Sequence, residues 1–440
     1  MSGIKFLLTI FCCISLSGIS IAQSGTITAG LSKVNITSPH EIPLHDSLYA
    51  RVLVLQDGNK RIAFIAVDQG IYTSDRIAKI GKEQFGLDVL FLSSSHTHSS
   101  GKSDETLVIS QLTKALKKAT DNMFPAKLAA GHRKFPQLGF NRLIVREDGH
   151  SRESWFSDDH YTSENPERIP FGPVDPEVGV IKVEDMQGNT KGIVMNYACH
   201  ADIVCSNYEI SADFPGVACK KVEEAFENNA VCLFVQGGAG NIESLIISSR
   251  RSGPDDSFKT DYRTIERVGS LLAYEAIKLT GSLTPSPIKQ AGIRYMNDSL
   301  QFTGRFMTDA LFDVHISTIL LNDNIAISTC PGEPFVQLQL EWKQKMRDAG
   351  SIPFLFGYTW YKGTWPNYIP DIKSAAQGGY GADQDGPTLI AVGSGEAIMN
   401  KHFENFFRLN GLMRKESGPV GFKGGSQWQT IEITPESKNK

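Results

Sequence analysis

Five polar motifs of the sequence contain residue types that can bind a metal ion or transfer a proton. They are residues 93–100 with His96 and His98, residues 196–200 ending in His200, residues 236–241 with three glycines, residues 330–334 with Glu333, and the aromatic segment 357–380. Neutral imidazole is the commonest protein ligand of zinc, and carboxylates complete many zinc sites. The sequence has no HExxH, GxSxG or kinase motif, and the glycine motif lacks the spacing of a nucleotide-binding loop. Together the five motifs favour a metal-dependent hydrolase.

Each motif also has a purely structural explanation when it is taken alone. In an extended chain His96 and His98 point to opposite sides, so we expect only one of them to reach a given ion. His200 resembles a buried core histidine. Asp213 is placed to cap the helix that follows it, and Glu333 is a carboxylate that the dipole at a helix start favours. The functional interpretation therefore depends on the motifs occurring together.

Strand-like and helix-like runs alternate along the chain and must position these motifs. Continuous or alternating apolar runs predict strands, and a 3.6-residue apolar period predicts helices. Predicted strands cover residues 49–54, 61–67, 89–94, 178–183, 192–197, 231–235, 316–321 and 325–328. Predicted helices cover residues 75–85, 105–118, 217–228, 263–279, 334–349 and 387–408. The pattern predicts an α/β fold, with one large mixed-sheet domain over residues 23–410 and a tail over residues 411–440.

Composition excludes several classes of protein. The 440 residues include 41% hydrophobic and 21% charged residues, which are proportions of a globular chain. The formal net charge is -4, so the chain has no global attraction to nucleic acid, and we expect no nucleic-acid partner. The mean hydropathy of -0.18 excludes a membrane protein with many spans. No protein partner is predicted. Contact with a membrane surface stays open, although no amphipathic helix with a basic face stands out.

Residues 1–22 have the pattern of a secretory signal peptide. Lys5 precedes the apolar run 6–14, and the small residues Ser20 and Ala22 favour cleavage before Gln23. A membrane anchor is the alternative, but the apolar run is short for one. We therefore expect a protein that is secreted or periplasmic.

Five cysteines remain after the signal peptide, and they have no dense spacing pattern. Buried free thiols are the favoured interpretation. A single disulfide, between Cys205 and Cys219, is the alternative in an oxidising compartment. The absence of any CxxC pair excludes a zinc site built from cysteines.

In their order along the chain, the motifs resemble those of the neutral ceramidases, zinc amidases that hydrolyse N-acyl-sphingosine. The resemblance covers roughly residues 27–410 and corresponds to the catalytic domain of that family. It rests on residues 29–39, 48–51, 68, 95–99, 200, 210–216, 236–241, 331–333 and 368–370. Ceramidases that act on sphingolipids carry an additional C-terminal β-domain, and we expect this chain to lack it.

The resemblance implies one Zn²⁺ per chain, with its ligands and catalytic groups at defined positions. The implied ligands are His96, His200, Glu333 and Tyr368. His98 is expected near the reacting carbonyl as the acid that protonates the leaving amine, and His98 or Tyr368 is expected to help hold the oxyanion.

The substrate-facing positions include one departure from the family pattern. Asn141-Arg142 resembles the pair that faces the substrate, and we predict substrate contacts from Arg142, Asn241 and Asp213. Where the family has an active-site serine, this chain has Glu243, followed by Ser244. Glu243 is predicted to act as a second acid or base if it reaches the site. Otherwise Ser244 shifts in, or the serine's role is absent.

These observations predict an exported zinc-dependent hydrolase that cleaves the amide bond of a lipid or small-molecule substrate through an activated water. A second hypothesis keeps the metal but places an ester, or a non-lipid N-acyl compound such as an acylated amino sugar, in the site. A third is a non-catalytic protein that binds lipid or glycan on the aromatic segment, and Glu243 at the serine position is its best argument.

Overall fold

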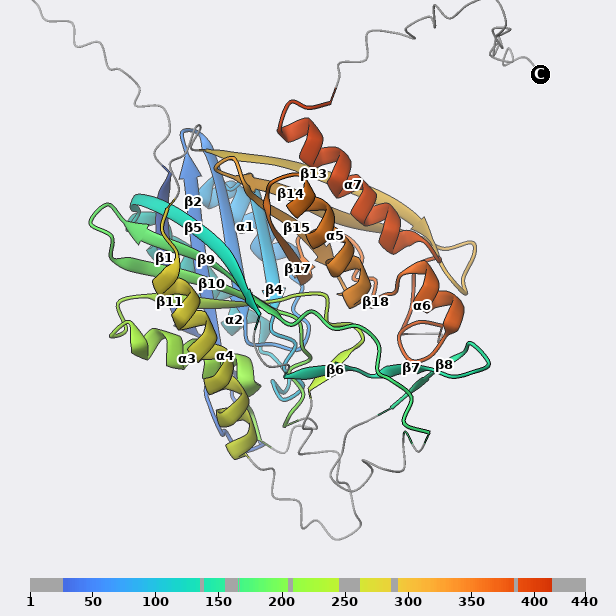
Figure 1. Ribbon diagram of the computed structural model, residues 1–440. Coiled ribbons are helices and arrows are strands. Elements are labelled where there is room, and N and C mark those ends of the chain that lie inside the picture. Colours follow the sequence, from blue (N-terminus) through green and yellow to red (C-terminus); the bar gives the residue numbers. More distant parts are fainter. Residues whose placement is uncertain are drawn as a thin grey trace, which may run out of the picture.

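The fold is built on one twelve-stranded sheet, in which parallel and antiparallel neighbours are mixed (Figure 1). The computed structural model describes residues 27–134, 138–154, 165, 167–204, 209–244, 262–285, 292–383 and 387–413. In sheet order the strands are β11 (Val231–Gln236), β10 (Thr190–Tyr197), β9 (Glu177–Asp185), β5 (Phe124–Lys134), β1 (Thr28–Asn35), β2 (Tyr49–Asp57), β3 (Lys60–Val67), β4 (Val89–Ser94), β17 (Ile352–Trp360), β15 (Ile325–Pro331), β14 (Leu311–Leu321) and β13 (Ile293–Thr303). The pairs β10–β11, β3–β4 and β15–β17 are parallel.

The sheet folds back on itself, so that its two halves pack face to face. Leu233 and Val235 of the edge strand β11 share one apolar cluster with Phe64 of β3, Phe91 of β4 and Phe356 of β17. The rings of Phe64 and Phe91 lie 4.9 Å apart, edge to face. Apolar burial of this kind is the main driving force for folding. It also brings the ends of β4, β10, β11 and β15 together at one edge of the interior.

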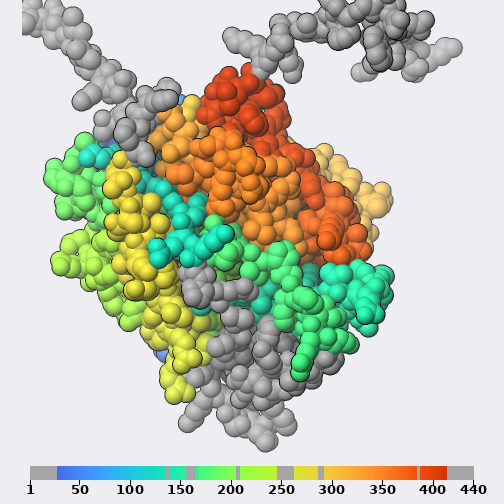
Figure 2. Space-filling model, in the orientation of Figure 1, coloured from blue at the N-terminus to red at the C-terminus, as the bar shows by residue number. Residues whose placement is uncertain are grey.

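Helices cover the outer face of each half of the sheet. In the described part of the chain they are α1 (Asp75–Phe85), α2 (Glu105–Asp121), α3 (Asp213–Ala225), α4 (Tyr262–Ser282), α5 (Val336–Asp348), α6 (Ile372–Gln377) and α7 (Ser394–Leu409). α1 and α2 pack on β2, β3 and β4, α3 and α4 pack on β9, β10 and β11, and α5 and α7 pack on β14, β15 and β17. Figure 2 shows α4 in yellow on one side of the visible face, with α5 and α7 in orange and red on the other. None of these described helices is long and apolar enough to span a membrane.

Three short strand pairs lie outside the main sheet, and two of them carry residues of the predicted site. They are β6 (Gly139–Asn141) with β12 (Ile242–Ser244), β7 (Leu143–Val145) with β8 (Ser151–Glu153), and β16 (Glu333–Pro334) with β18 (Tyr368–Ile369). Only the last pair is parallel, and it places Glu333 opposite Tyr368. Residues distant in the sequence thus become direct neighbours.

The predicted α/β fold with one large mixed sheet is confirmed, and α1 and β4 have the predicted bounds. The prediction was wrong for residues 357–360, which belong to β17, and for residues 387–393, which precede the helix predicted there. Four described cysteines, Cys199, Cys219, Cys232 and Cys330, are buried free thiols, so Cys219 forms no disulfide. Cys205, the predicted signal peptide and residues 414–440 of the tail lie outside the described residues.

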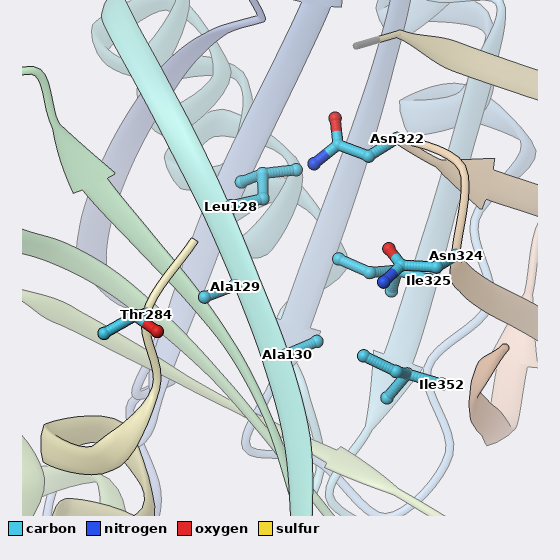
Figure 3. A pocket seen from close by; sticks show the side chains of 8 residues that line it. All are labelled: Leu128, Ala129, Ala130, Thr284, Asn322, Asn324, Ile325 and Ile352. Carbon is cyan, nitrogen blue, oxygen red and sulfur yellow. The ribbon is translucent and has the colours of Figure 1, made fainter. Parts of the chain in front are cut away.

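A small hollow lies far from the predicted site, at the end of β17 that begins with Ile352 (Figure 3). Its volume is about 30 Å³, and its lining includes Leu128, Asn322 and Asn324. The side-chain oxygen of Asn322 is buried and has no hydrogen-bond partner among the described residues. A space of this size holds a water molecule. It is too small for an organic substrate, so it does not compete with the site described below.

We expect His402 of α7 to make the stability of the fold sensitive to acid. Its Nδ1 lies 2.8 Å from Oγ1 of Thr318, and its Nε2 lies 3.0 Å from the carbonyl oxygen of Thr329. Burial lowers the pKa of His402 from 6.5 to about 4, although the Thr329 carbonyl and Asp298 act in the opposite direction. The unfolded chain therefore binds more protons than the folded chain between these values, and stability is lost as the pH falls. We expect a loss of about 2 to 3 kcal/mol between about pH 7 and about pH 4.5 from this group alone.

Urea unfolding of the wild type and of His402→Gln at both pH values isolates this contribution. Other titrating groups act equally in the two proteins, so the wild type should lose more stability on acidification than the variant does. Equal losses would show that His402 is not the source.

Candidate metal centre

His96 is turned toward the interior by an unusual backbone conformation just after β4. Its φ is 63°, in the left-handed region, so the chain is not extended here. The expectation that His96 and His98 point to opposite sides is therefore wrong, and their rings lie 4.8 Å apart. The Nδ1 of His96 lies 2.8 Å from the carbonyl oxygen of Gly70. A carbonyl only accepts hydrogen bonds, so Nδ1 carries the proton and Nε2 presents a lone pair.

His200 follows β10, and backbone carbonyl groups orient its ring in the same way as that of His96. Its Nδ1 lies 2.8 Å from the carbonyl oxygen of Ala239 and 3.0 Å from that of Ile242. Both acceptors fix the proton on Nδ1, which again leaves the lone pair on Nε2. The residue is fully buried, and its Nε2 has no well-aligned hydrogen bond to any part of the chain that the structure describes.

Glu333 is the point on which the two histidines converge. Its Oε2 lies 3.5 Å from Nε2 of His96 and 3.3 Å from Nε2 of His200. Gly332 precedes it with a φ of 81°, a conformation that glycine adopts without strain. Burial alone raises the pKa of Glu333, but His96, His200 and Arg142 outweigh this effect and lower it to about 2. The carboxylate is therefore ionised at neutral pH.

The three converging atoms fit a cation. Burial lowers the pKa of His96, so its imidazole is neutral at neutral pH. Nε2 of His96 and Nε2 of His200 both converge on one oxygen of the Glu333 carboxylate, an arrangement that a metal ion stabilises. A set of nitrogen and oxygen donors of this kind suits zinc. The ligand atoms of His96, His98 and His200 also lie within 4.8 Å of one another, so His98 is an alternative third ligand.

His98 is the least buried of the three histidines. Its backbone N–H donates to the carbonyl oxygen of Ala201 at 3.0 Å, which ties its position to the loop that follows His200. Burial lowers its pKa to about 3, with further lowering by His96 and His200. A neutral imidazole at this position can accept a proton.

Two tyrosines flank the carboxylate. Tyr358 donates its hydroxyl to Oε2 of Glu333 at 3.3 Å, and its ring lies 4.7 Å from that of His96. Tyr368, the predicted ligand, is paired with Glu333 across β16 and β18, and its ring stacks on His200 at 6.5 Å. Tyr358 was not among the predicted site residues. Its only sequence signal was its place in the aromatic segment, because the φ of 53° that turns it inward is not typical of tyrosine.

Arg142 and Glu243 form a buried ion pair beside this cluster. Nη1 of Arg142 lies 2.7 Å from Oε2 of Glu243, and Nη2 donates to the carbonyl oxygen of Gly240 at 2.7 Å. The guanidinium lies 5.4 Å from the ring centre of Tyr368 and 4.7 Å from that of Tyr380. Glu243 also acts to raise the pKa of His98, so the carboxylate is close to that ring. The guanidinium is thus balanced by a carboxylate within the site.

The other two predicted substrate contacts use their side chains to fix the backbone. Asn241 accepts a hydrogen bond from the backbone N–H of Val336 at 3.0 Å and donates to Gln337 at 2.9 Å, which anchors the start of α5. Asp213 accepts from the backbone N–H groups of Val204 at 2.9 Å and Phe214 at 2.6 Å. Contact of either residue with a substrate stays a prediction.

Replacing Tyr358 by phenylalanine tests whether its hydroxyl orients Glu333. The phenyl ring fills the same space, but Oε2 of Glu333 loses a donor. Residues that orient a metal ligand affect affinity by about 10- to 100-fold, and we expect a loss of about 10-fold in zinc affinity. Chelator competition measures the affinity. Tyr295→Phe is the matched control. The hydroxyl of Tyr295 also hydrogen-bonds a carboxylate, that of Asp88, but Tyr295 lies on β13 and not in the metal centre. Equal zinc affinity in the two variants would remove Tyr358 from the centre.

Comparisons with known proteins bear on the fold. Neutral ceramidase from Pseudomonas aeruginosa superposes with a TM-score of 0.65 at 15% identity, covering 88% of this chain and 75% of the other. A ceramidase complexed with C2 gives a TM-score of 0.68 at 14% identity, covering 90% of this chain and 77% of the other. No family model matches the sequence. At this level of identity the likeness shows that the chain has a ceramidase-like fold.

Proposed function

We propose that the chain is a zinc-dependent hydrolase of amide bonds and a distant member of the neutral ceramidase family. The observation that carries the proposal is the convergence of Nε2 of His96 and Nε2 of His200 on Oε2 of Glu333. The fold supports it, because two solved structures of like fold are ceramidases. His96, His200 and Glu333 hold the ion, with Tyr368 or His98 as a further ligand.

Zinc, when bound, supplies a Lewis acid and an activated water at neutral pH. The protein supplies the proton transfers. His98, whose ring lies 4.8 Å from that of His96, is the group that takes a proton from the attacking water and then donates it to the leaving amine. Burial raises the pKa of Tyr358 and of Tyr368 well above the usual value, so both phenols stay protonated. The hydroxyl of Tyr358 donates to Glu333, and that of Tyr368 can donate to the oxyanion. Substrate lies against Arg142, whose position Glu243 fixes.

A lipid amide is the first candidate substrate, by analogy with the named activity of the two ceramidases of like fold. A polar N-acyl compound is the second candidate. It is favoured by the Arg142–Glu243 pair, because Glu243 puts a charged group near His98 that an acyl chain cannot match. Turnover of N-acyl-sphingosine against short N-acyl and ester chromogens, including an acylated amino sugar, separates these candidates.

Metal content of the purified protein tests the proposal first. Elemental analysis of the wild type should give about one zinc per chain, as expected for one converging ligand set. A protein that holds no zinc, and takes up none when it is added, would instead favour the non-catalytic binding protein.

Export is a further part of the proposal and rests on residues 1–22. Amino-terminal sequencing of the protein from its native cell tests it. We expect the mature chain to begin at Gln23. A mature protein that begins at Met1 would overturn the proposal of export and leave the metal centre unaffected.

A further inference from the structure

The glycine turn after β11 packs against α5 too closely for any side chain. A β-carbon at Gly237 would lie 2.4 Å from Oε1 of Gln339, and one at Gly240 would lie 2.3 Å from the carbonyl oxygen of Glu333. Real β-carbons do not approach other atoms this closely. The path of the turn is therefore set by α5 on one side and by the strand that carries Glu333 on the other.

Gln339 of α5 fixes the turn through a buried hydrogen-bond network. Its Oε1 accepts from the backbone N–H of Gly238 at 2.5 Å, and its Nε2 donates to Oδ2 of Asp175 at 2.5 Å. Asp175 is held in turn by Nζ of Lys343 at 2.5 Å, and Nζ lies 3.3 Å from Glu177. All of these side chains are buried. Because both ends of the amide are engaged, the network specifies one orientation of Gln339.

The same turn supplies the carbonyl that orients His200. The residue after Gly238 is Ala239, whose carbonyl oxygen lies 2.8 Å from Nδ1 of His200. We propose that Gln339 is a positioning residue for His200. Through Gly238 it holds the Ala239 carbonyl, which also accepts from the backbone N–H of Ile242 at 2.9 Å, so the carbonyls of both residues stay where they keep the proton on Nδ1 and direct Nε2 at Glu333. The consequence for zinc rests on the proposed function, but the ring tautomer can be measured without any metal.

The test compares Gln339→Met with Gln344→Met. Both substitutions remove an amide from α5, but Gln344 is exposed and bonds only locally, to Asp348. Two measurements are made on each full-length protein. Nitrogen NMR of the histidine rings gives the tautomer of His200, with the signal assigned from His200→Asn. Chelator competition gives the zinc affinity.

We expect Gln339→Met to show a mixture of the two His200 tautomers and to bind zinc about 10-fold more weakly, while Gln344→Met matches the wild type in both. Lys343→Met removes the ammonium of the network but leaves the bond from Gly238 to Gln339. This variant should have a lower thermal stability but keep the wild-type tautomer of His200. If Gln339 acted only by stabilising the fold, Lys343→Met would change the tautomer as well.

A wild-type tautomer and zinc affinity in Gln339→Met would overturn the proposal. So would loss of the tautomer in Lys343→Met to the same extent, because the network would then act only through stability. If Gln339→Met does not fold, Gly238→Ala pushes the turn away from α5, since its β-carbon would lie 3.0 Å from Cβ of Gln339. It should give the same tautomer mixture. If the wild type takes up no zinc, the proposed function fails, and the ring signals still decide the role of Gln339.

Discussion

Replacing His200 by alanine is expected to abolish both zinc binding and amide hydrolysis. The Nε2 of His200 lies 3.3 Å from Oε2 of Glu333, and its Nδ1 is fixed by two carbonyl groups, so the ring is oriented as a direct ligand. Removal of a residue that only orients a ligand lowers metal affinity by about 10- to 100-fold, and removal of a direct ligand should lower it further. We therefore expect the zinc affinity to fall by more than about 100-fold, with activity falling in step. His96→Ala should behave in the same way.

Chelator competition, elemental analysis and turnover on one N-acyl substrate check this prediction together. His150→Ala is the matched control, because His150 is exposed in the turn between β7 and β8, where its Nδ1 lies 3.7 Å from Oδ1 of Asp148. Full zinc content and full turnover in either His96→Ala or His200→Ala would show that the ligand assignment is wrong. Loss of activity with zinc retained would move that histidine from metal binding to substrate contact.

The buried ion pair of Arg142 and Glu243 predicts the largest effect on stability. Their side chains are 2% and 0% exposed, and the charged atoms are 2.7 Å apart. Breaking such a pair from one side leaves an uncompensated buried charge, which costs about 3 to 5 kcal/mol. We expect Arg142→Met to lose this amount of unfolding free energy. Replacing both residues by methionine should restore most of it, because buried pairs are often no more stable than apolar groups of similar volume.

Urea unfolding of the two single variants and the double variant gives the coupling energy of the pair. Lys117→Met is the control, since Lys117 and Asp121 form an exposed pair on α2 whose loss should change stability by less than about 1 kcal/mol. If the double variant is stable but inactive, the pair serves substrate binding and not the stability of the fold. If the double variant is as unstable as Arg142→Met, the pair itself stabilises the fold.

The strands and helices with regular apolar patterns could be predicted from the sequence, and those without could not. β2, β3 and β4 are continuous apolar runs bounded by turns, and they were found. β13 alternates half-buried and exposed residues at the sheet edge and was missed. β17 was partly mistaken for a loop because Gly357 interrupts it and Tyr358 has a left-handed backbone. Tertiary packing, not local preference, makes that segment a strand.

The predicted site residues depended on the family resemblance more than on local pattern. Nothing near Glu333 or Tyr368 indicates that they meet, because their pairing is made by two strands of two residues each. The left-handed backbone of His96 was also invisible, since glycine is the usual residue in that conformation. The structure brings His96, His98, His200, Glu333, Tyr368, Arg142 and Glu243 into one region.

The face-to-face packing of the two halves of the sheet has a consequence for how long the native protein survives. His200 comes from the half that contains β10, whereas His96 and Glu333 come from the half that contains β4 and β15. An ion held between these residues joins the two halves. It binds only after these distant parts of the chain have come together, and contacts between distant parts of a chain form slowly. Bound metal stabilises the native state by mass action. Zinc-loaded protein should therefore resist proteases far longer than chelator-treated protein, with the first cuts of the latter falling where the halves separate.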